Sequence, residues 1–291
     1  MSIATQSLLF NTTPKNPCSA FSAEQPMRTI VFSSQKGGSG KTTLCGQLAI
    51  QAELAGKGPV ALIDTDPQGS LADWWNARTE DSPMFVQTDV ECLADTLAEL
   101  RASGVKLVFI DTQPTVTDVI RDIVNCADLV VIPTRPSPHD LRAVGPTLDL
   151  VERCGKPLIF AVNCATRRAR ITGDAAVALS QHGTVAPVTV HNRTDFATSM
   201  VDGRSVMETK PDGPSAKEIT ALWDYLDGRL ARIEPPRAET LFGPAAVAPA
   251  ILKDIAAAAQ DDADEDIPVI VSERRAPACF GRRPITTHAG V

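Results

Sequence analysis

Short apolar runs alternate with longer amphipathic stretches between residues 27 and 162 of this chain. Apolar runs of this length are typical of strands buried on both faces, and the stretches between them have helical periodicity. The expected strands are 27–34, 60–63, 84–87, 105–110, 129–132 and 158–162, and the expected helices are 44–54, one beginning near 70, 91–102, 117–126 and 138–154. This alternation predicts an α/β fold, with a mostly parallel β-sheet and helices on both faces.

The pattern weakens after residue 162 and changes character at residue 235. We expect a helix near 174–181, a strand at 185–190, a short helix at 195–201 and a final helix at 215–233. Residues 235–291 are rich in Ala and Pro and hold an acidic run, which is typical of a solvated, disordered tail. Residues 1–26 lack periodicity and are expected to be a disordered leader, so the predicted domain is 27–234.

A glycine-rich loop stands between the first predicted strand and the first predicted helix. Residues 35–43 read Gln-Lys-Gly-Gly-Ser-Gly-Lys-Thr-Thr, which departs from G-x-x-x-x-G-K-[ST] only at Gln35. Glycines let such a loop curl with its N–H groups facing inward, and the helix start adds further unpaired N–H groups, so the loop predicts a phosphate site. Lys41 is expected to reach the β- and γ-phosphates of ATP and Thr42 to hold Mg²⁺. The residues expected to cradle the nucleotide are Gly37, Gly38, Ser39, Gly40, Lys41, Thr42 and Thr43.

Carboxylates follow two further predicted strands. Asp111 ends the apolar strand 105–110, where one carboxylate suits the shell of a magnesium ion. Asp64 and Asp66 follow strand 60–63, and Pro67 ends that strand at once, so the two side chains can diverge. The sequence therefore predicts one carboxylate for the metal shell and one for the attacking water.

These motifs resemble those of the ParA/MinD group of P-loop ATPases. The stretch from Lys36 to Thr42 resembles their deviant Walker A loop, and residues 64–68 are similar to the Asp-x-Asp-Pro-Gln segment of ParA proteins. The resemblance covers residues 27 to about 233. It implies that Lys36 reaches the phosphates of a second subunit, that Asp64 belongs to the outer metal shell, and that Asp66 positions water. The sequence after Asp111 departs slightly from the family pattern.

The resemblance extends to a proline-rich loop at 133–140, which is similar to the Pro-x-x-Pro-Ser-Pro-x-Asp loop of small partition proteins. It implies that Pro133 and Pro136 form a wall near the adenine and the dimer interface. Asn163 follows the next strand, where a hydrogen bond to the base edge and a plain strand-end turn both fit. As a whole, the resemblance implies an ATP-bound homodimer that binds double-stranded DNA nonspecifically and is released when a ParB-like partner stimulates hydrolysis.

Charge adds a candidate DNA surface to this picture. The chain has a net charge of −7, but residues 163–210 hold six basic and four acidic side chains. A local basic patch matters more than total charge for gripping phosphates. The candidate DNA contacts are Arg193, which lies in a segment similar to the DNA-binding region of partition ATPases, and Arg167 and Arg168.

Composition and cysteine spacing predict where the protein is located, and two alternative functions remain to be considered. There is no run of 18 apolar residues and no signal peptide. The seven cysteines fall in no metal-ligand spacing. We therefore expect a cytoplasmic, nucleoid-associated protein without a membrane partner. One rival is the nitrogenase iron protein type, but Cys92 and Cys126 stand away from Asp111, near which a cluster ligand is expected. The other is a MinD-like or cargo-positioning scaffold ATPase that acts on a protein cluster instead of a replicon. The sequence does not exclude this second rival.

Overall fold

The computed structural model describes residues 26–234, so the expected tail and nearly all of the expected leader lie outside it. Seven strands form one sheet in the order β3-β2-β4-β1-β5-β6-β7. Every pairing between neighbouring strands is parallel. The strands are β1 Arg28–Phe32, β2 Val60–Asp64, β3 Met84–Val86, β4 Leu107–Asp111, β5 Leu129–Thr134, β6 Leu158–Val162 and β7 Thr184–Val185. The predicted parallel α/β sheet is confirmed.

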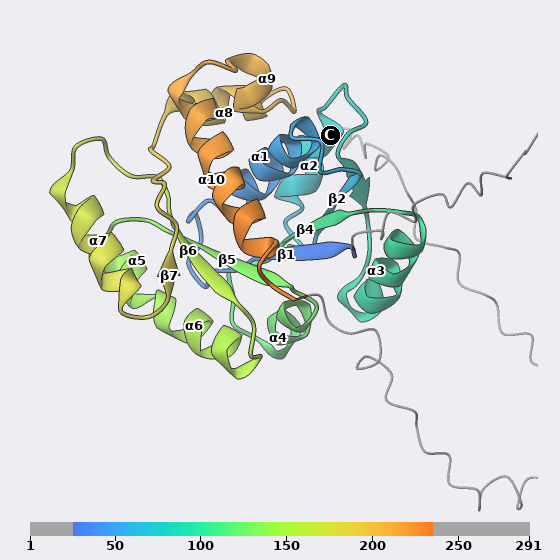
Figure 1. Ribbon diagram of the computed structural model, residues 1–291, viewed down its shortest axis with the longest axis horizontal. Coiled ribbons are helices and arrows are strands. Elements are labelled where there is room, and N and C mark those ends of the chain that lie inside the picture. Colours follow the sequence, from blue (N-terminus) through green and yellow to red (C-terminus); the bar gives the residue numbers. More distant parts are fainter. Residues whose placement is uncertain (1–25, 235–291) are drawn as a thin grey trace, which may run out of the picture.

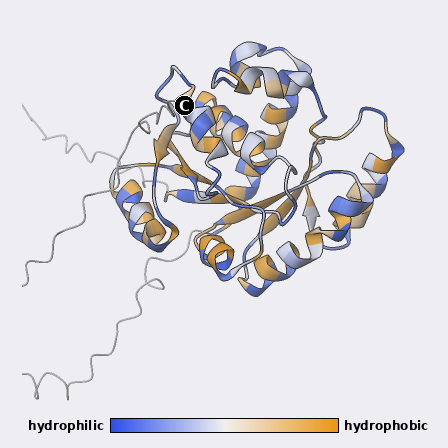
Figure 2. Cartoon of the chain, turned by 180° about the vertical axis from the view of Figure 1, so that it is seen from behind, coloured by the Kyte–Doolittle hydropathy of each residue, from blue (hydrophilic) through white to orange (hydrophobic). Residues whose placement is uncertain are grey.

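Alternate side chains of the strands enter two separate cores, one on each face of the sheet. In β1, Ile30 and Phe32 belong to one core and Val31 belongs to the other. Helices α1, α2, α8, α9 and α10 cover the first face, and α3 to α7 cover the second (Figure 1). Apolar colour is concentrated on the strands (Figure 2). Both faces are buried, which explains why the strand sequences are almost wholly apolar.

The helices agree closely with the expected ones, and the differences concern two helical regions and one strand. Their bounds are α1 Lys41–Leu54, α2 Ser70–Asn76, α3 Leu93–Ala102, α4 Asp118–Asn125, α5 Pro138–Arg142, α6 Val144–Arg153, α7 Arg170–Ser180, α8 Thr194–Met200, α9 Val206–Thr209 and α10 Pro214–Leu230, with a 3₁₀ turn η1 at Val90–Cys92. The single helix expected at 138–154 is two helices, α5 and α6, because Pro146 cannot share a continuous helix with the carbonyl of Arg142. The strand expected at 185–190 stops at Val185, since Pro187 lacks the N–H that a ladder needs. Helix α9 was not expected.

The order of the strands brings the candidate site residues together at the carboxyl ends of β1, β2 and β4. The chain runs through β2, β3 and β4 on one side of β1 and then through β5, β6 and β7 on the other, so the order reverses at β1. Ligands in open parallel sheets bind outside the carboxyl ends of the strands at such a point. Asp111 pairs in register with Phe32 on one side and with Asp64 on the other. The ends of β1, β2 and β4 therefore lie level beside the glycine loop.

No helix among residues 26–234 is long and apolar enough to cross a membrane.

Candidate functional site

The glycine-rich loop, residues 33–40, connects β1 to α1, as predicted. Gly38 and Gly40 have φ values of 71° and 94°, in the left-handed region that favours glycine. A Cβ at Gly40 would lie 2.2 Å from Nδ2 of Asn163, which donates a hydrogen bond of 2.8 Å to the carbonyl of Ser39. Asn163 thus braces the loop from the end of β6. Its predicted contact with the base edge stays a prediction.

Lys41 is a buried ammonium at the start of α1. Its side chain is aimed back along the loop, where Nζ donates to the carbonyl of Ser34 at 3.2 Å. Burial lowers the pKa of Lys41, while the nearby charges of Asp111 and Asp66 raise it. Lys41 therefore lies close enough to both carboxylates to interact with their charges, and it places a cation at the base of the loop.

Thr42 and Asp111 meet at the sheet edge. The Thr42 hydroxyl donates to Oδ2 of Asp111 at 2.6 Å, while Oδ1 of Asp111 is buried without a hydrogen-bond partner. Burial raises the pKa of Asp111 to about 7, against the hydrogen bond from Thr42. Mg²⁺ prefers oxygen ligands, and this pair offers a hydroxyl oxygen and a carboxylate oxygen that has no hydrogen-bond partner. These two residues fit the predicted metal site.

The second aspartate loop is organised by Asp64. Its Oδ2 accepts hydrogen bonds from the backbone N–H groups of Leu71 and Ala72, at 3.1 and 3.0 Å, and its Oδ1 accepts from that of Asp66 at 3.0 Å. Asp64 thus caps the start of α2, and burial raises its pKa. Both oxygens accept hydrogen bonds from the backbone, an arrangement that fits the predicted place of Asp64 in the outer metal shell.

Asp66 is half-buried beside the same loop. Its Oδ1 accepts from the N–H of Gln68 at 3.0 Å, which fixes the turn, and its charge reaches Lys41. Lys36 is exposed at the rim of the glycine loop, where its backbone N–H donates a hydrogen bond to the Ser34 hydroxyl. The roles of Asp66 with water and of Lys36 with a second subunit stay predictions.

A pocket of about 210 Å³ lies beside the glycine loop. Gly40, Thr43 and Asn163 form one wall, and residues 190–200, with the apolar Phe196 and Met200, form the other. Pro133 and Pro136 do not line this pocket. The structure gives a physical reason, since β5 extends through Pro133, which is buried in register with Ala161 of β6. The expectation that these prolines form a wall for the base is therefore not supported at this pocket.

The arginine segment, residues 190–208, differs from its expected form. The guanidinium of Arg193 pairs with the carboxylate of Glu218 on α10 through two contacts, one of 2.7 Å from Nη2 to Oε1, and only 15% of the Arg193 side chain is exposed. His191 also contacts Glu218. Burial raises the pKa of Glu218, but the hydrogen bonds from Arg193 and His191 outweigh it and hold the pKa below its usual range. Arg193 is thus engaged within the fold, whereas Arg167 and Arg168 are exposed before α7.

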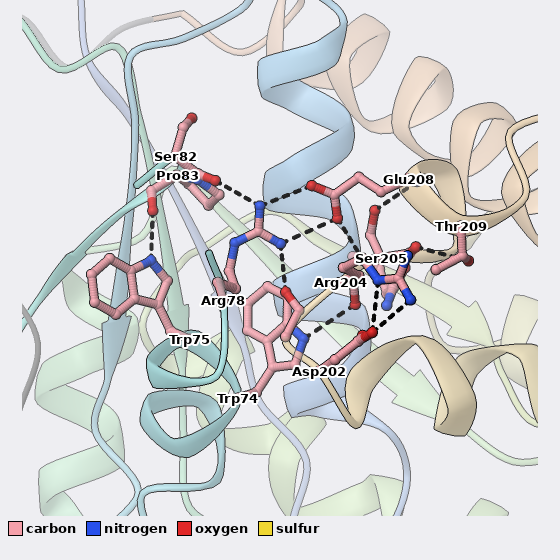
Figure 3. Close-up of polar contacts among 12 residues, drawn as sticks. Trp74, Trp75, Arg78, Ser82, Pro83, Asp202, Arg204, Ser205, Glu208 and Thr209 are labelled. Carbon is pink, nitrogen blue, oxygen red and sulfur yellow. Dashed lines mark hydrogen bonds and ion pairs between the residues drawn. The ribbon is translucent and has the colours of Figure 1, made fainter. Parts of the chain in front are cut away.

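A second polar cluster ties the same segment to α2 (Figure 3). The buried Arg78 donates to the carbonyls of Gly203 and Ser82 and to both oxygens of Glu208. The indole N–H of Trp74 donates to the carbonyl of Arg204, whose own side chain pairs with Asp202. A Cβ at Gly203 would lie 2.3 Å from the backbone of Arg78, so the two chain segments are in direct contact. This cluster fixes residues 203–208 against the helix that Asp64 caps.

Three important residues were not found from the sequence. Arg135 lies beside Gly38, Glu218 binds Arg193, and Arg78 holds the arginine segment. Arg135 carried a signal, because it follows a strand on the same sheet edge as the other site residues. Glu218 and Arg78 carried no such signal, because their partners lie 25 and 130 residues away in the sequence.

The iron protein interpretation gains no support from the cysteines. Cys92 lies in η1 and Cys126 directly follows α4. Within residues 26–234 no group of three or more His, Cys, Asp or Glu side chains is placed to hold a metal ion.

Comparisons with known proteins identify the family of the chain. Residues 27–202 match the family model of the VirC1 protein. The chain is 29% identical over 200 residues to maintenance of carboxysome distribution protein A of Halothiobacillus neapolitanus, which covers 65% of this chain and 91% of that protein. It is 32% identical over 128 residues to protein ParA of Rhizobium radiobacter, covering 43% of this chain and 56% of that protein.

A solved structure has the same fold. The septum site-determining protein MinD from Pyrococcus horikoshii, complexed with Mg-ADP, superposes with a TM-score of 0.56 at 15% identity, covering 71% of this chain and all of the other. The chain therefore shares the fold of that structure.

Proposed function

The chain belongs to the VirC1 protein family, within the ParA/MinD group of ATPases, and on that premise we propose that it is a magnesium-dependent ATPase that positions a cargo inside the cell. One observation carries the catalytic part of the proposal. Asp111 holds a buried oxygen without a partner beside the Thr42 hydroxyl and the Lys41 ammonium. A buried carboxylate oxygen is costly to leave unpaired unless a ligand completes it.

Each residue of the site has a role in hydrolysis. The backbone of the glycine loop and Lys41 would bind the β- and γ-phosphates, and Thr42 and Asp111 would hold Mg²⁺, which would supply positive charge beside the phosphate oxygens. Asp66 orients the attacking water, with its loop anchored through Asp64 to α2. Lys36, exposed at the rim, completes the site of a second subunit, so that ATP drives formation of a homodimer.

A protein assembly is the cargo that the relatives favour. The match to the carboxysome distribution protein covers 91% of that protein, whereas the match to ParA covers 56% of its length. The proposed function is therefore closer to the positioning of a protein cluster than to replicon partition.

Replicon partition is the second candidate, supported by the 32% identity to ParA over 128 residues. In that case a ParB-like centromere-binding protein would stimulate hydrolysis. Both candidates share a dimer that binds double-stranded DNA nonspecifically, and the exposed Arg167 and Arg168 are its best-placed contacts.

Two measurements test these proposals. Phosphate release by the purified full chain should depend on ATP and Mg²⁺ and be lost in Lys41→Ala. To separate the cargoes, the gene would be deleted in its host and both the spacing of protein assemblies and the loss rate of each replicon would be followed. Uneven assemblies with stable replicons support the first candidate, and replicon loss with evenly spaced assemblies supports the second.

A further inference from the structure

Arg135 is a cation beside the phosphate loop that none of the motifs accounts for. It directly follows β5, so its backbone stands at the same sheet edge as the glycine loop. Its Nη2 lies 3.0 Å, and its Nη1 4.0 Å, from the position that a Cβ would occupy at Gly38. Glycine at this position, with φ of 71°, leaves room for a guanidinium against the loop.

The segment that carries Arg135 is held firmly, while its side chain stays accessible. The carbonyl of Arg135 accepts from the N–H of Ser137 at 2.8 Å, and the Ser137 hydroxyl and the Asp140 carboxylate hydrogen-bond to each other at the start of α5. Proline on both sides of Ser137 stiffens the turn further. Arg135 itself is exposed. Its backbone is fixed and its guanidinium can still adjust to a ligand.

The charge of Arg135 is not neutralised by the fold. Arg78, Arg193 and Arg204 each pair with a carboxylate, whereas among residues 26–234 Arg135 forms no ion pair. Its neighbour is the thiol of Cys164, whose pKa burial raises and Arg135 lowers. A thiol with a raised pKa is uncharged near neutral pH, so it provides no counter-charge.

This geometry points to Arg135 as a phosphate-contacting residue that makes the site prefer ATP to ADP, an inference that rests on the proposed ATPase function. A guanidinium is permanently charged and binds phosphate oxygens through two parallel N–H donors. ATP carries one more phosphate group and more negative charge than ADP, so a cation at the rim of the loop adds more to its binding. Arg135 thus complements Lys41, which approaches the loop from its buried side.

The test compares the affinities of the full-length protein for a slowly hydrolysed ATP analogue, ATPγS, and for ADP, by calorimetry with Mg²⁺. Arg135→Ala should weaken ATPγS binding by about 10- to 100-fold, the worth of a charge-assisted hydrogen bond, and ADP binding by less than about threefold. Arg135→Lys, which keeps the charge but loses the fork, should lie between wild type and Arg135→Ala. Arg142→Ala, which removes another exposed arginine seven residues on, should bind both nucleotides as wild type does.

Steady-state kinetics give a second readout. Arg135→Ala should raise KM for ATP more than it lowers kcat, since the residue acts in binding. Equal affinities of wild type and Arg135→Ala, or an equal loss for both nucleotides, would overturn the inference while leaving the ATPase proposal intact. Failure of the wild-type protein to bind either nucleotide would overturn the ATPase proposal and this inference with it.

Discussion

The phosphate loop and the arginine segment are both rich in polar side chains, but they differ in how well the fold satisfies them. At the loop, the Ser39 hydroxyl and Oδ1 of Asp111 are buried without hydrogen-bond partners, and Lys36 is exposed. In the arginine segment, Arg193 and Arg204 are paired with Glu218 and Asp202. Polar groups that the fold leaves open are available to a ligand, whereas paired groups mainly hold the structure together. The comparison indicates that the phosphate loop is a binding site, whereas the arginine segment is a structural element whose sequence resembles a binding site.

Lys41→Ala should have the largest effect. Removing a buried cation from the phosphate site leaves the phosphate charge without its partner, so ATP affinity should fall by about 1,000-fold. Calorimetric titration of ATPγS measures this loss. Lys36→Ala is the matched control, and it should keep most of the affinity of a single subunit but lose ATP-dependent dimerisation in light scattering. Similar affinity losses in both variants would contradict the separate roles of the two lysines.

Asp66→Ala should bind ATP and turn it over slowly. The carboxylate lies outside the phosphate cradle, so its loss should lower kcat by about 100-fold, as expected for a group that orients water and accepts its proton. Phosphate release under saturating ATP gives kcat. The water-positioning role would move to another residue if this variant hydrolysed ATP at the wild-type rate.

Asp111→Asn should stabilise the nucleotide-free protein while it abolishes magnesium-dependent binding. The pKa of Asp111 is raised to about 7, so between about pH 4 and 7 the folded protein holds a proton that the unfolded chain has released. The stability of the wild type should therefore fall as pH rises through this window. Above pH 7 the variant should gain about 1–3 kcal/mol, because it removes the buried charge. Thermal unfolding in EDTA at pH 5 to 8 tests the sign, and an equal pH slope in both proteins would exclude Asp111 as the cause.

Substitutions of the arginines should give the smallest effects on ligand binding. Arg167→Ala with Arg168→Ala should lower duplex DNA affinity several-fold and flatten the salt dependence by about two counterions per subunit. Arg193→Ala should change DNA affinity by less than about twofold and instead cost about 1–3 kcal/mol of stability, since Glu218 keeps its contacts with His191 but loses its charged partner. Salt titrations with ATPγS and chemical unfolding separate the two results. A flatter salt slope for Arg193→Ala would show that the ion pair opens on DNA.

The features of the site predicted from the sequence are those that follow from local chain geometry and parallel pairing. Thr42 and Asp111 are 69 residues apart, yet they meet because each adjoins the end of a parallel strand at the same edge. The proximity of Thr42 and Asp111 could therefore be predicted from the sequence. The glycine-rich composition of the loop likewise permits the positive φ values that Gly38 and Gly40 adopt.

The features that could not be predicted depend on side-chain partners across the fold. Nothing in the residues around Arg193 indicates that Glu218, one turn into α10, occupies its guanidinium. The residues around Asp64 likewise do not indicate that α2 presents the N–H groups of Leu71 and Ala72 to its carboxylate. In both cases the hydrogen-bond partner comes from an element whose position depends on the whole fold.

One measurement tests the central claim most directly, namely calorimetric titration of ATPγS into the full-length wild-type protein with Mg²⁺ and then with EDTA. If the open oxygen of Asp111 and the Thr42 hydroxyl mark a magnesium–nucleotide site, binding should be saturable with Mg²⁺ and at least about tenfold weaker without it. The same metal dependence should be absent in Asp111→Asn. Equal binding of ATPγS with and without Mg²⁺, or no binding at all, would contradict the account.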